Sequence, residues 1–209
     1  MAKIYDWMSL GLLITALVSF FVAANPELMK TMVLSNFVWI LMIAELGIVF
    51  AISGAVTRLS YSTAAALFLV YSALNGITLA PIFYIYTAGS IAATFFVTAA
   101  MFGAMAVYGH LTKADLTGMG SMMFMGLIGL IVASLVNLFL QSEGLYWIIS
   151  YAGVVIFCGL TAWDVQKFKQ WAGADPELSN KLSILGALAL YLDFINIFLH
   201  LLRIMGRRR

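Results

Sequence analysis

Charge is scarce in this chain of 209 residues, because only 10% of them are Asp, Glu, Lys or Arg while 64% are hydrophobic. An ordinary soluble domain has about 25% charged residues and roughly 45–50% apolar residues. The chain therefore has too few polar side chains to cover a globule in water, and the same composition excludes intrinsic disorder. An integral membrane protein with several spanning helices is the class that remains.

Cysteine and histidine are also rare, with one cysteine, Cys158, and two histidines, His110 and His200. A single cysteine excludes a disulfide scaffold, and its apolar neighbours favour a small buried hydrophobe over a reactive thiol. Two histidines cannot supply a three-histidine zinc site. Because nucleophile-elbow and P-loop patterns are absent as well, we expect no enzyme activity and no resident cofactor. We also expect no nucleic-acid partner.

Seven apolar runs are long enough to cross a bilayer as helices, which requires about 17–25 residues each. The first run is longer than the apolar core of a signal peptide, typically about 7–15 residues, so it counts as a helix. The sequence thus predicts an all-α integral membrane protein. We expect one seven-helix domain over residues 1–209, with helices at about 7–24, 37–55, 61–81, 91–108, 122–140, 145–163 and 182–205.

The basic residues of the short loops indicate the orientation, because Lys and Arg are enriched on the cytoplasmic side. If the N-terminus is cytoplasmic, the outer loops hold only Lys30, whereas the inner segments hold Lys3, Arg58, Lys113, Lys167, Lys169 and Lys181. The sequence therefore predicts a cytoplasmic N-terminus. The tail departs from this rule, since an odd number of spans puts its four arginines outside: Arg203, Arg207, Arg208 and Arg209.

Small residues recur on one face of the fourth run, at Ala92, Ala99, Gly103 and Ala106. Helices in lipid associate by close packing, and small residues four apart allow two backbones to approach. We expect this face, and a similar groove at Gly126 and Gly129, to form helix contacts with no functional role.

Ionisable residues inside the apolar runs are the informative ones, because a charge at the bilayer centre costs at least about 2.5–3.5 kcal/mol. Glu45 lies about 12 Å into the second run and Asp193 about 16 Å into the seventh. Glu45 has two interpretations that the residues alone leave open. It is either a protonated carboxyl bonded to a neighbouring helix or a ligand on an ion or proton path.

Asp193 shares one helical face with Asn196, His200 and Arg203. A polar stripe on an apolar helix faces protein or water and not lipid. We expect Asp193 to line a hydrated path and His200 to be a structural residue. Asp164 ends the sixth run with Lys167 three residues on, and by itself this pattern is typical of an interfacial ion pair.

The segment from Ser183 to Arg203, with its Leu-Tyr-Leu-Asp-Phe-Ile-Asn motif around Asp193, strongly resembles the signature end of the Bax inhibitor-1 family. This family is also called the transmembrane Bax inhibitor motif family. The likeness continues in Tyr71-Ser-Ala-Leu-Asn-Gly-Ile-Thr-Leu, in Thr98-Ala-Ala-Met-Phe-Gly-Ala-Met and in Thr161-Ala-Trp-Asp. The chain is most similar to the bacterial inner-membrane branch. The resemblance implies a central C-terminal helix between two three-helix groups.

The resemblance also implies a function, a pH-sensitive calcium leak channel of the bacterial inner membrane. Asp164 and Asp193 match the aspartate pair that senses pH and gates the path, and Arg58 is the candidate for its gating counter-charge. Glu45 matches a glutamate on the ion pathway, to which we also assign Asn196. The expected partners are the lipid bilayer, calcium ions and protons.

Elementary electrostatics fits these roles, because two carboxylates in one low-dielectric site cannot both ionise at low cost. At low pH the pair shares a proton and holds the sixth and seventh helices together, and at higher pH repulsion separates them. Carboxylates suit calcium, but three of them at different depths are fewer than the six to eight oxygens of a tight site. We therefore expect no high-affinity metal site, only weak calcium contact at Asp164, Asp193 and Glu45.

A function of another class stays open, that of a stress or protease-associated membrane regulator that transports nothing and acts through partners such as a membrane protease. The three costly carboxylates favour transport over a pure scaffold.

The loop charges generate a first prediction, that the N-terminus is cytoplasmic and the first helix crosses the membrane. A reporter fused after the first helix should therefore read as periplasmic. The measurement is a paired alkaline phosphatase and fluorescent-protein fusion at that position. A cytoplasmic signal there would contradict the orientation.

Overall fold

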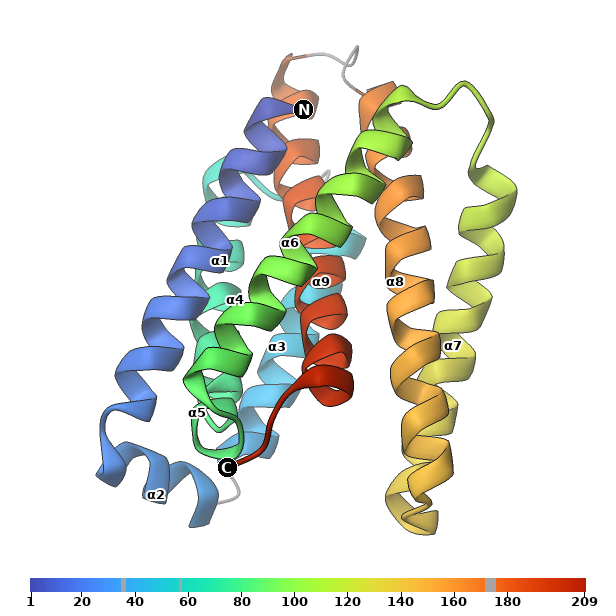
Figure 1. The fold of residues 1–209 in the computed structure, drawn as a ribbon. Helices are drawn as coiled ribbons and strands as arrows, with labels where there is room; N and C mark the ends of the chain where they lie inside the picture. Colours follow the sequence, from blue (N-terminus) through green and yellow to red (C-terminus); the bar gives the residue numbers. More distant parts are fainter. Residues whose placement is uncertain (35–36, 57, 172–175) are drawn as a thin grey trace. The chain divides into compact units, whose positions relative to one another are not determined.

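The structure is a computed structural model that describes residues 1–34, 37–56, 58–171 and 176–209. Its helices, drawn in Figure 1, are α1 (Ala2–Ala23), α2 (Pro26–Leu34), α3 (Phe37–Ala55), α4 (Tyr61–Leu79), α5 (Ile82–Ile85), α6 (Ala88–Leu111), α7 (Thr117–Leu140), α8 (Glu143–Gln170) and α9 (Pro176–Met205). Among the described residues, seven helical segments are long and apolar enough to cross a membrane, and α4 with α5 forms one of them. The predicted all-α class with seven spans is confirmed.

Polar residues at the starts of two helices satisfy free backbone N–H groups. The side chain of Ser60 accepts a hydrogen bond of 3.1 Å from the Thr63 N–H and so caps α4. Thr87 caps α6 in the same way, with 3.3 Å to the Ser90 N–H. Helix α8 differs most from expectation, since it continues from the predicted end at residue 163 to Gln170.

The chain divides into two compact units, and α9 contributes to both. The first unit comprises residues 1–86, 171–191 and 209, so it holds α1 to α5 and the first part of α9. The second unit comprises residues 87–170 and 192–208, and it holds α6, α7, α8 and the second part of α9. Each group of three spans therefore contains a part of the last helix.

In the first unit, α4 packs against both α1 and α3. Two glycines allow the close approach of α1 and α4. A Cβ at Gly76 would lie 2.8 Å from the Thr15 carbonyl oxygen, and one at Gly11 would meet the Phe68 ring. The phenyl ring of Phe68 is fully buried, with its centroid 5.8 Å from that of Tyr191 on α9.

In the second unit, α8 packs against α6 and α7, and Figure 1 shows α7 and α8 as neighbouring antiparallel helices. A Cβ at Gly109 of α6 would overlap the backbone of Ala162 on α8. On α7, Gly120 lies directly against the Trp163 ring. Helices α6 and α7 therefore contact α8 at glycines. In the predicted orientation, these contacts lie toward the cytoplasmic half of α8.

The small-residue faces predicted for the fourth and fifth spans are correct only in part, since Ala106 is buried and a Cβ at Gly126 would lie 3.2 Å from Ile156 of α8. Among the described residues nothing lies within 4 Å of a Cβ built at Gly103 or Gly129, and Ala92 is exposed. The face that α6 buries shares Ala106 with the predicted one but is centred about a quarter of a turn from it, and it comprises Thr94, Thr98, Phe102, Ala106 and Gly109. Thr98 can occupy this face because its hydroxyl bonds to its own helix, at 2.8 Å from the Thr94 carbonyl, whereas Thr94 Oγ1 has no partner among the described residues.

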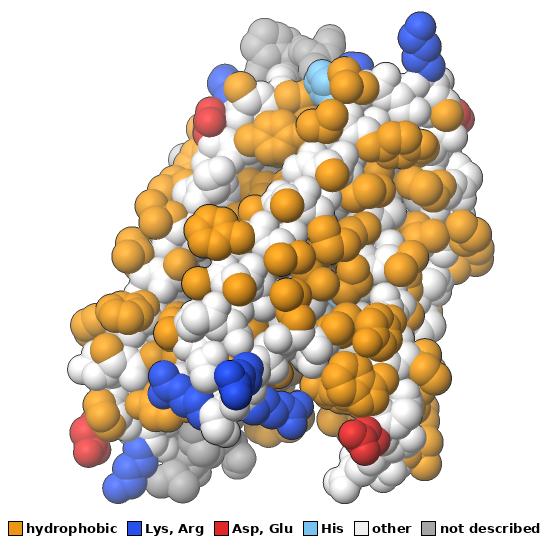
Figure 2. Space-filling model, in the orientation of Figure 1, with side chains coloured by type: hydrophobic (Ala, Val, Ile, Leu, Met, Phe, Trp, Pro, Cys, Tyr) orange, Lys and Arg blue, Asp and Glu red, His pale blue; other side chains and the backbone are white. Residues whose placement is uncertain are grey.

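The faces that α3 and α7 turn outward are apolar, as lipid requires. On α7, Phe139 is 89% exposed and Leu138 is 66% exposed. In Figure 2, hydrophobic side chains cover the helices between their ends, while Lys, Arg, Asp and Glu side chains gather near the ends. By contrast, 67% of the residues in the most apolar stretch of α9 are buried, so α9 contacts protein along most of its length.

The connection between α6 and α7 is organised by a carboxylate outside the spans. Asp115 Oδ1 accepts hydrogen bonds from the Thr117 hydroxyl at 2.6 Å and from the Thr117 N–H at 2.9 Å. The hydroxyl and then the backbone bond stabilise the ionised form, so they lower the pKa of Asp115 from its ordinary value. This turn sets the start of α7.

Glycine packing against α8 generates a second prediction. Gly109→Ala should lower the free energy of unfolding by about 1–3 kcal/mol, because the new methyl group collides with rigid backbone. Gly103→Ala is the matched control on the same helix and should be neutral or slightly stabilising, since alanine is the better helix former. Thermal unfolding of the purified protein in detergent measures both. Equal shifts for the two variants would contradict the packing.

Candidate functional site

Asp164 lies inside α8 and not at its end. Six residues follow it before the helix ends at Gln170, a distance of about 9 Å along the axis. Its carboxylate lies 3.9 Å from Lys167 Nζ, with side-chain exposures of 12% for the aspartate and 34% for the lysine. The ammonium also lies 4.7 Å from the centre of the Trp163 ring. Lys167 therefore extends past an aromatic ring while it balances part of the charge of Asp164.

Asp193, on α9, is the second buried carboxyl of this unit and is only 4% exposed. It interacts electrostatically with Asp164 and with the side chain of Thr161. Its Oδ2 atom has no hydrogen-bond partner among the residues that the structure describes. We call Asp164, Asp193, Thr161 and Lys167 the aspartate site. It brings together the two aspartates that the sequence singled out, although their direct hydrogen bond stays a prediction.

His200 lies two turns beyond Asp193 on α9 and is also buried. Its ring stacks on Phe157 with 5.9 Å between centroids, and it fills the space that Gly153 leaves open on α8. Within the described part of the chain its Nδ1 has no hydrogen-bond partner. These contacts are those of a packing residue, in keeping with the structural role expected for His200.

Asn196, expected on the ion pathway, is half-buried on the same helix. Its Nδ2 donates a hydrogen bond of 2.8 Å to the Leu192 carbonyl of its own helix. The amide nitrogen is thus occupied by local backbone, and the role on a pathway stays a prediction.

Glu45 lies on α3 in the first unit and is half-buried. Its Oε1 accepts a hydrogen bond of 2.9 Å from the hydroxyl of Thr78 on α4. Both interpretations of this carboxyl survive, because an interhelix hydrogen bond fits a structural residue and partial exposure fits an ion ligand.

A buried tyrosine cluster near Glu45 was missed by sequence reasoning. The Tyr191 hydroxyl lies 2.6 Å from Thr15 Oγ1, and the Tyr191 ring packs against Tyr71 with 5.7 Å between centroids. Glu45 interacts electrostatically with both tyrosines. The hydroxyl residues Thr15 and Ser19, four apart on an apolar helix, were the signal that pointed to this contact.

Arg58, the expected gating counter-charge, lies in an exposed turn after α3, where its N–H donates to the Ala55 carbonyl at 2.9 Å. It belongs to the first unit, whereas Asp164 belongs to the second. Its pairing with Asp164 therefore stays a prediction. In the described part of the chain, no three His, Cys, Asp or Glu side chains form a metal-binding group.

Seven apolar helical segments with carboxyl groups buried between them define a multi-pass α-helical membrane protein. The family model described as Inhibitor of apoptosis-promoting Bax1 matches residues 1–209, so the chain belongs to the Bax inhibitor family. The chain is 52% identical to Inner membrane protein YbhL of Escherichia coli K12, over 100% of its own length and 92% of that protein. The predicted family is confirmed.

Other bacterial relatives match over the same length. An uncharacterised protein of Borreliella burgdorferi is 50% identical, over 100% of this chain and 92% of that protein. An uncharacterised membrane protein of Streptococcus pyogenes serotype M6 is 40% identical, over 99% of this chain and 91% of that protein. The match thus covers the spans of both units.

Proposed function

We propose that this chain is a multi-pass protein of the bacterial inner membrane that lets calcium ions pass under control of pH. The inner-membrane location rests on the name of the Escherichia coli relative and on the seven apolar segments. The proposal assigns the chain no catalytic role and no resident cofactor, with calcium as the transported ion. The observation that carries it is the aspartate site of the second unit.

Two features of the aspartate site support gating over a purely structural role. A structural carboxyl in a membrane protein is expected to have its hydrogen bonds satisfied within the protein. Asp193 instead keeps one buried oxygen without a partner among the described residues, beside a second buried carboxyl. A shared proton at low pH, or a cation at higher pH, supplies what that oxygen lacks.

The direction of the pH effect follows from this chemistry. When the proton concentration is high, one shared proton joins the two carboxyls, α8 and α9 stay together, and the path is closed. As the pH rises the proton leaves, and two negative charges in a low-dielectric site repel each other. Calcium flux should therefore rise with pH.

The third prediction tests the aspartates as one titrating unit. In liposomes loaded with a calcium dye, Asp193→Asn and Asp164→Asn should each abolish the difference in flux between an acidic and a mildly alkaline pH. The double variant should add little, because coupled groups act together. Asp115→Asn, which changes an exposed loop carboxylate, is the matched control and should keep the pH response of the unmodified protein. Additive, independent effects of the two spanning aspartates would contradict the shared proton.

The fourth prediction concerns Glu45. Glu45→Gln keeps an acceptor for the Thr78 hydroxyl and so should preserve the fold. It should lower calcium flux roughly tenfold, because one charge near a cation contributes about 1–4 kcal/mol in media of high to intermediate dielectric. Glu27→Gln, an exposed change in the first turn of α2, is the control and should leave flux unchanged. Unchanged flux in Glu45→Gln would favour the structural interpretation of this carboxyl.

The same liposome measurement separates the proposal from a regulator that acts only through protein partners. Purified protein without any partner should conduct calcium if the proposal is correct. If it is folded yet passes no calcium at either pH, transport is excluded and the regulatory function replaces it.

A further inference from the structure

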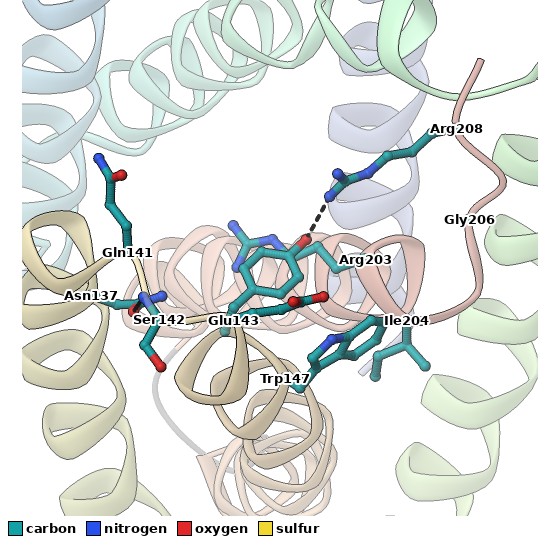
Figure 3. A pocket seen from close by; sticks show the side chains of 10 residues that line it. Asn137, Gln141, Ser142, Glu143, Trp147, Arg203, Ile204, Gly206 and Arg208 are labelled. Carbon is teal, nitrogen blue, oxygen red and sulfur yellow. Dashed lines mark hydrogen bonds between the residues drawn. The ribbon is translucent and has the colours of Figure 1, made fainter.

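A pocket in the second unit lies apart from the aspartate site, where α7 meets α8 and α9 ends. It has a volume of about 490 Å³, and Figure 3 shows the side chains that line it. It is formed by the α7–α8 turn, the first turn of α8 and the last turn of α9 with the following tail. Its lining residues include Gln141, Ser142, Glu143, Tyr146, Trp147, Arg203 and Arg208.

Two arginines reach the pocket from the C-terminal segment and meet at one tyrosine. The Arg203 guanidinium lies over the Tyr146 ring, 5.9 Å from its centroid. Arg208 Nη2 donates a hydrogen bond of 3.3 Å to the Tyr146 hydroxyl, drawn as a dashed line in Figure 3. A guanidinium has five N–H donors and can stack on an aromatic ring, so it can bind more than one acceptor at a time.

The backbone on both sides of the pocket is fixed by hydrogen bonds. The Arg207 N–H donates to Ser90 Oγ at 3.0 Å, and the Arg207 carbonyl accepts from the Thr87 N–H at 3.0 Å. On the opposite side, Gln141 ends α7 in a left-handed conformation with φ of 49°, and Asn137 Oδ1 accepts from the Ser142 N–H at 2.9 Å. The pocket is thus built from anchored segments.

The position of the pocket points to an amphipathic anion. A turn between consecutive spans lies at the membrane surface, and Trp and Tyr are enriched at that depth. Beside the turn, α7 presents Leu138, Phe139 and Leu140 with exposures of 66%, 89% and 64%, a surface for acyl chains. A basic pocket next to an apolar helix face is the arrangement that binds anionic lipid headgroups.

We propose that this pocket binds the phosphodiester headgroup of an anionic glycerophospholipid of the phosphatidylglycerol type, whose acyl chains lie along α7. Arg203 and Arg208 bind the phosphate oxygens, and the Gln141 amide and the Ser142 hydroxyl suit the glycerol hydroxyls. Glu143 also lines the pocket; it is acidic and exposed, and it opposes the anion. The inference is independent of the proposed calcium passage.

The experiment measures the affinity of the full-length protein for dioleoylphosphatidylglycerol in neutral detergent by native mass spectrometry, with dioleoylphosphatidylcholine as the neutral lipid. Arg203→Gln with Arg208→Gln should weaken phosphatidylglycerol binding about tenfold or more, since each basic residue near anionic lipid contributes to affinity. Arg207→Gln with Arg209→Gln removes the same charge from the same tail outside the pocket and should change binding less than about threefold. Glu143→Gln should strengthen binding.

Several results would overturn the inference. Equal losses in the two double variants would mean that only net tail charge matters, and equal affinity for the two lipids would exclude recognition of an anion. Inorganic phosphate or glycerol phosphate that competes as well as the lipid would reduce the pocket to a site for soluble anions. If the double variant in the pocket does not fold, the same comparison can be made between the single variants Arg208→Gln and Arg209→Gln, which change neighbouring residues of the tail. Glu143→Gln tests the inference in the opposite direction, because it should raise the affinity for phosphatidylglycerol.

Discussion

The exclusion of charge from lipid is the constraint on which the second unit depends. Asp164 and Asp193 exist in an apolar chain only because α8 and α9 bury them against protein, with Thr161 and Lys167 beside them. Their burial in turn requires close helix packing, which glycines such as Gly109 make possible by admitting the α8 backbone. The close packing of the helices and the burial of the two aspartates therefore depend on each other.

The first unit meets the same constraint with neutral groups. Thr15 joins α1, α4 and α9 through one hydroxyl, which lies 2.8 Å from the Ser72 carbonyl and 2.6 Å from the Tyr191 hydroxyl. Glu45, a carboxyl within the apolar helix α3, is likewise bonded to a hydroxyl, that of Thr78. Hydroxyl groups serve this purpose well, because they can bond to their own helix and to a neighbour together.

Much of this could be predicted from the sequence, because apolar length and the rarity of buried carboxylates are properties of single helices. The seven spans follow from them, and so does the choice of Asp193 as a buried carboxyl, whereas the role expected for Asp164 came only from the family resemblance. What the sequence could not supply was the side of each helix that meets another. On α6 the small residues around Gly103 suggested one face, but the structure buries Thr94 and Thr98 instead. Such a choice depends on the partner helix, and Tyr191 with Thr15 was missed for the same reason.

The burial of the single cysteine has a practical consequence. Cys158 is 8% exposed and lies within α8 among apolar side chains, so it is shielded from water-soluble thiol reagents. For labelling experiments, the unmodified chain therefore behaves almost as a protein without cysteine. A cysteine introduced in the exposed loop before α7 would be labelled selectively by a spin probe or a fluorophore. Movements of the helices could then be followed in a bilayer without first replacing a residue of the packed interior.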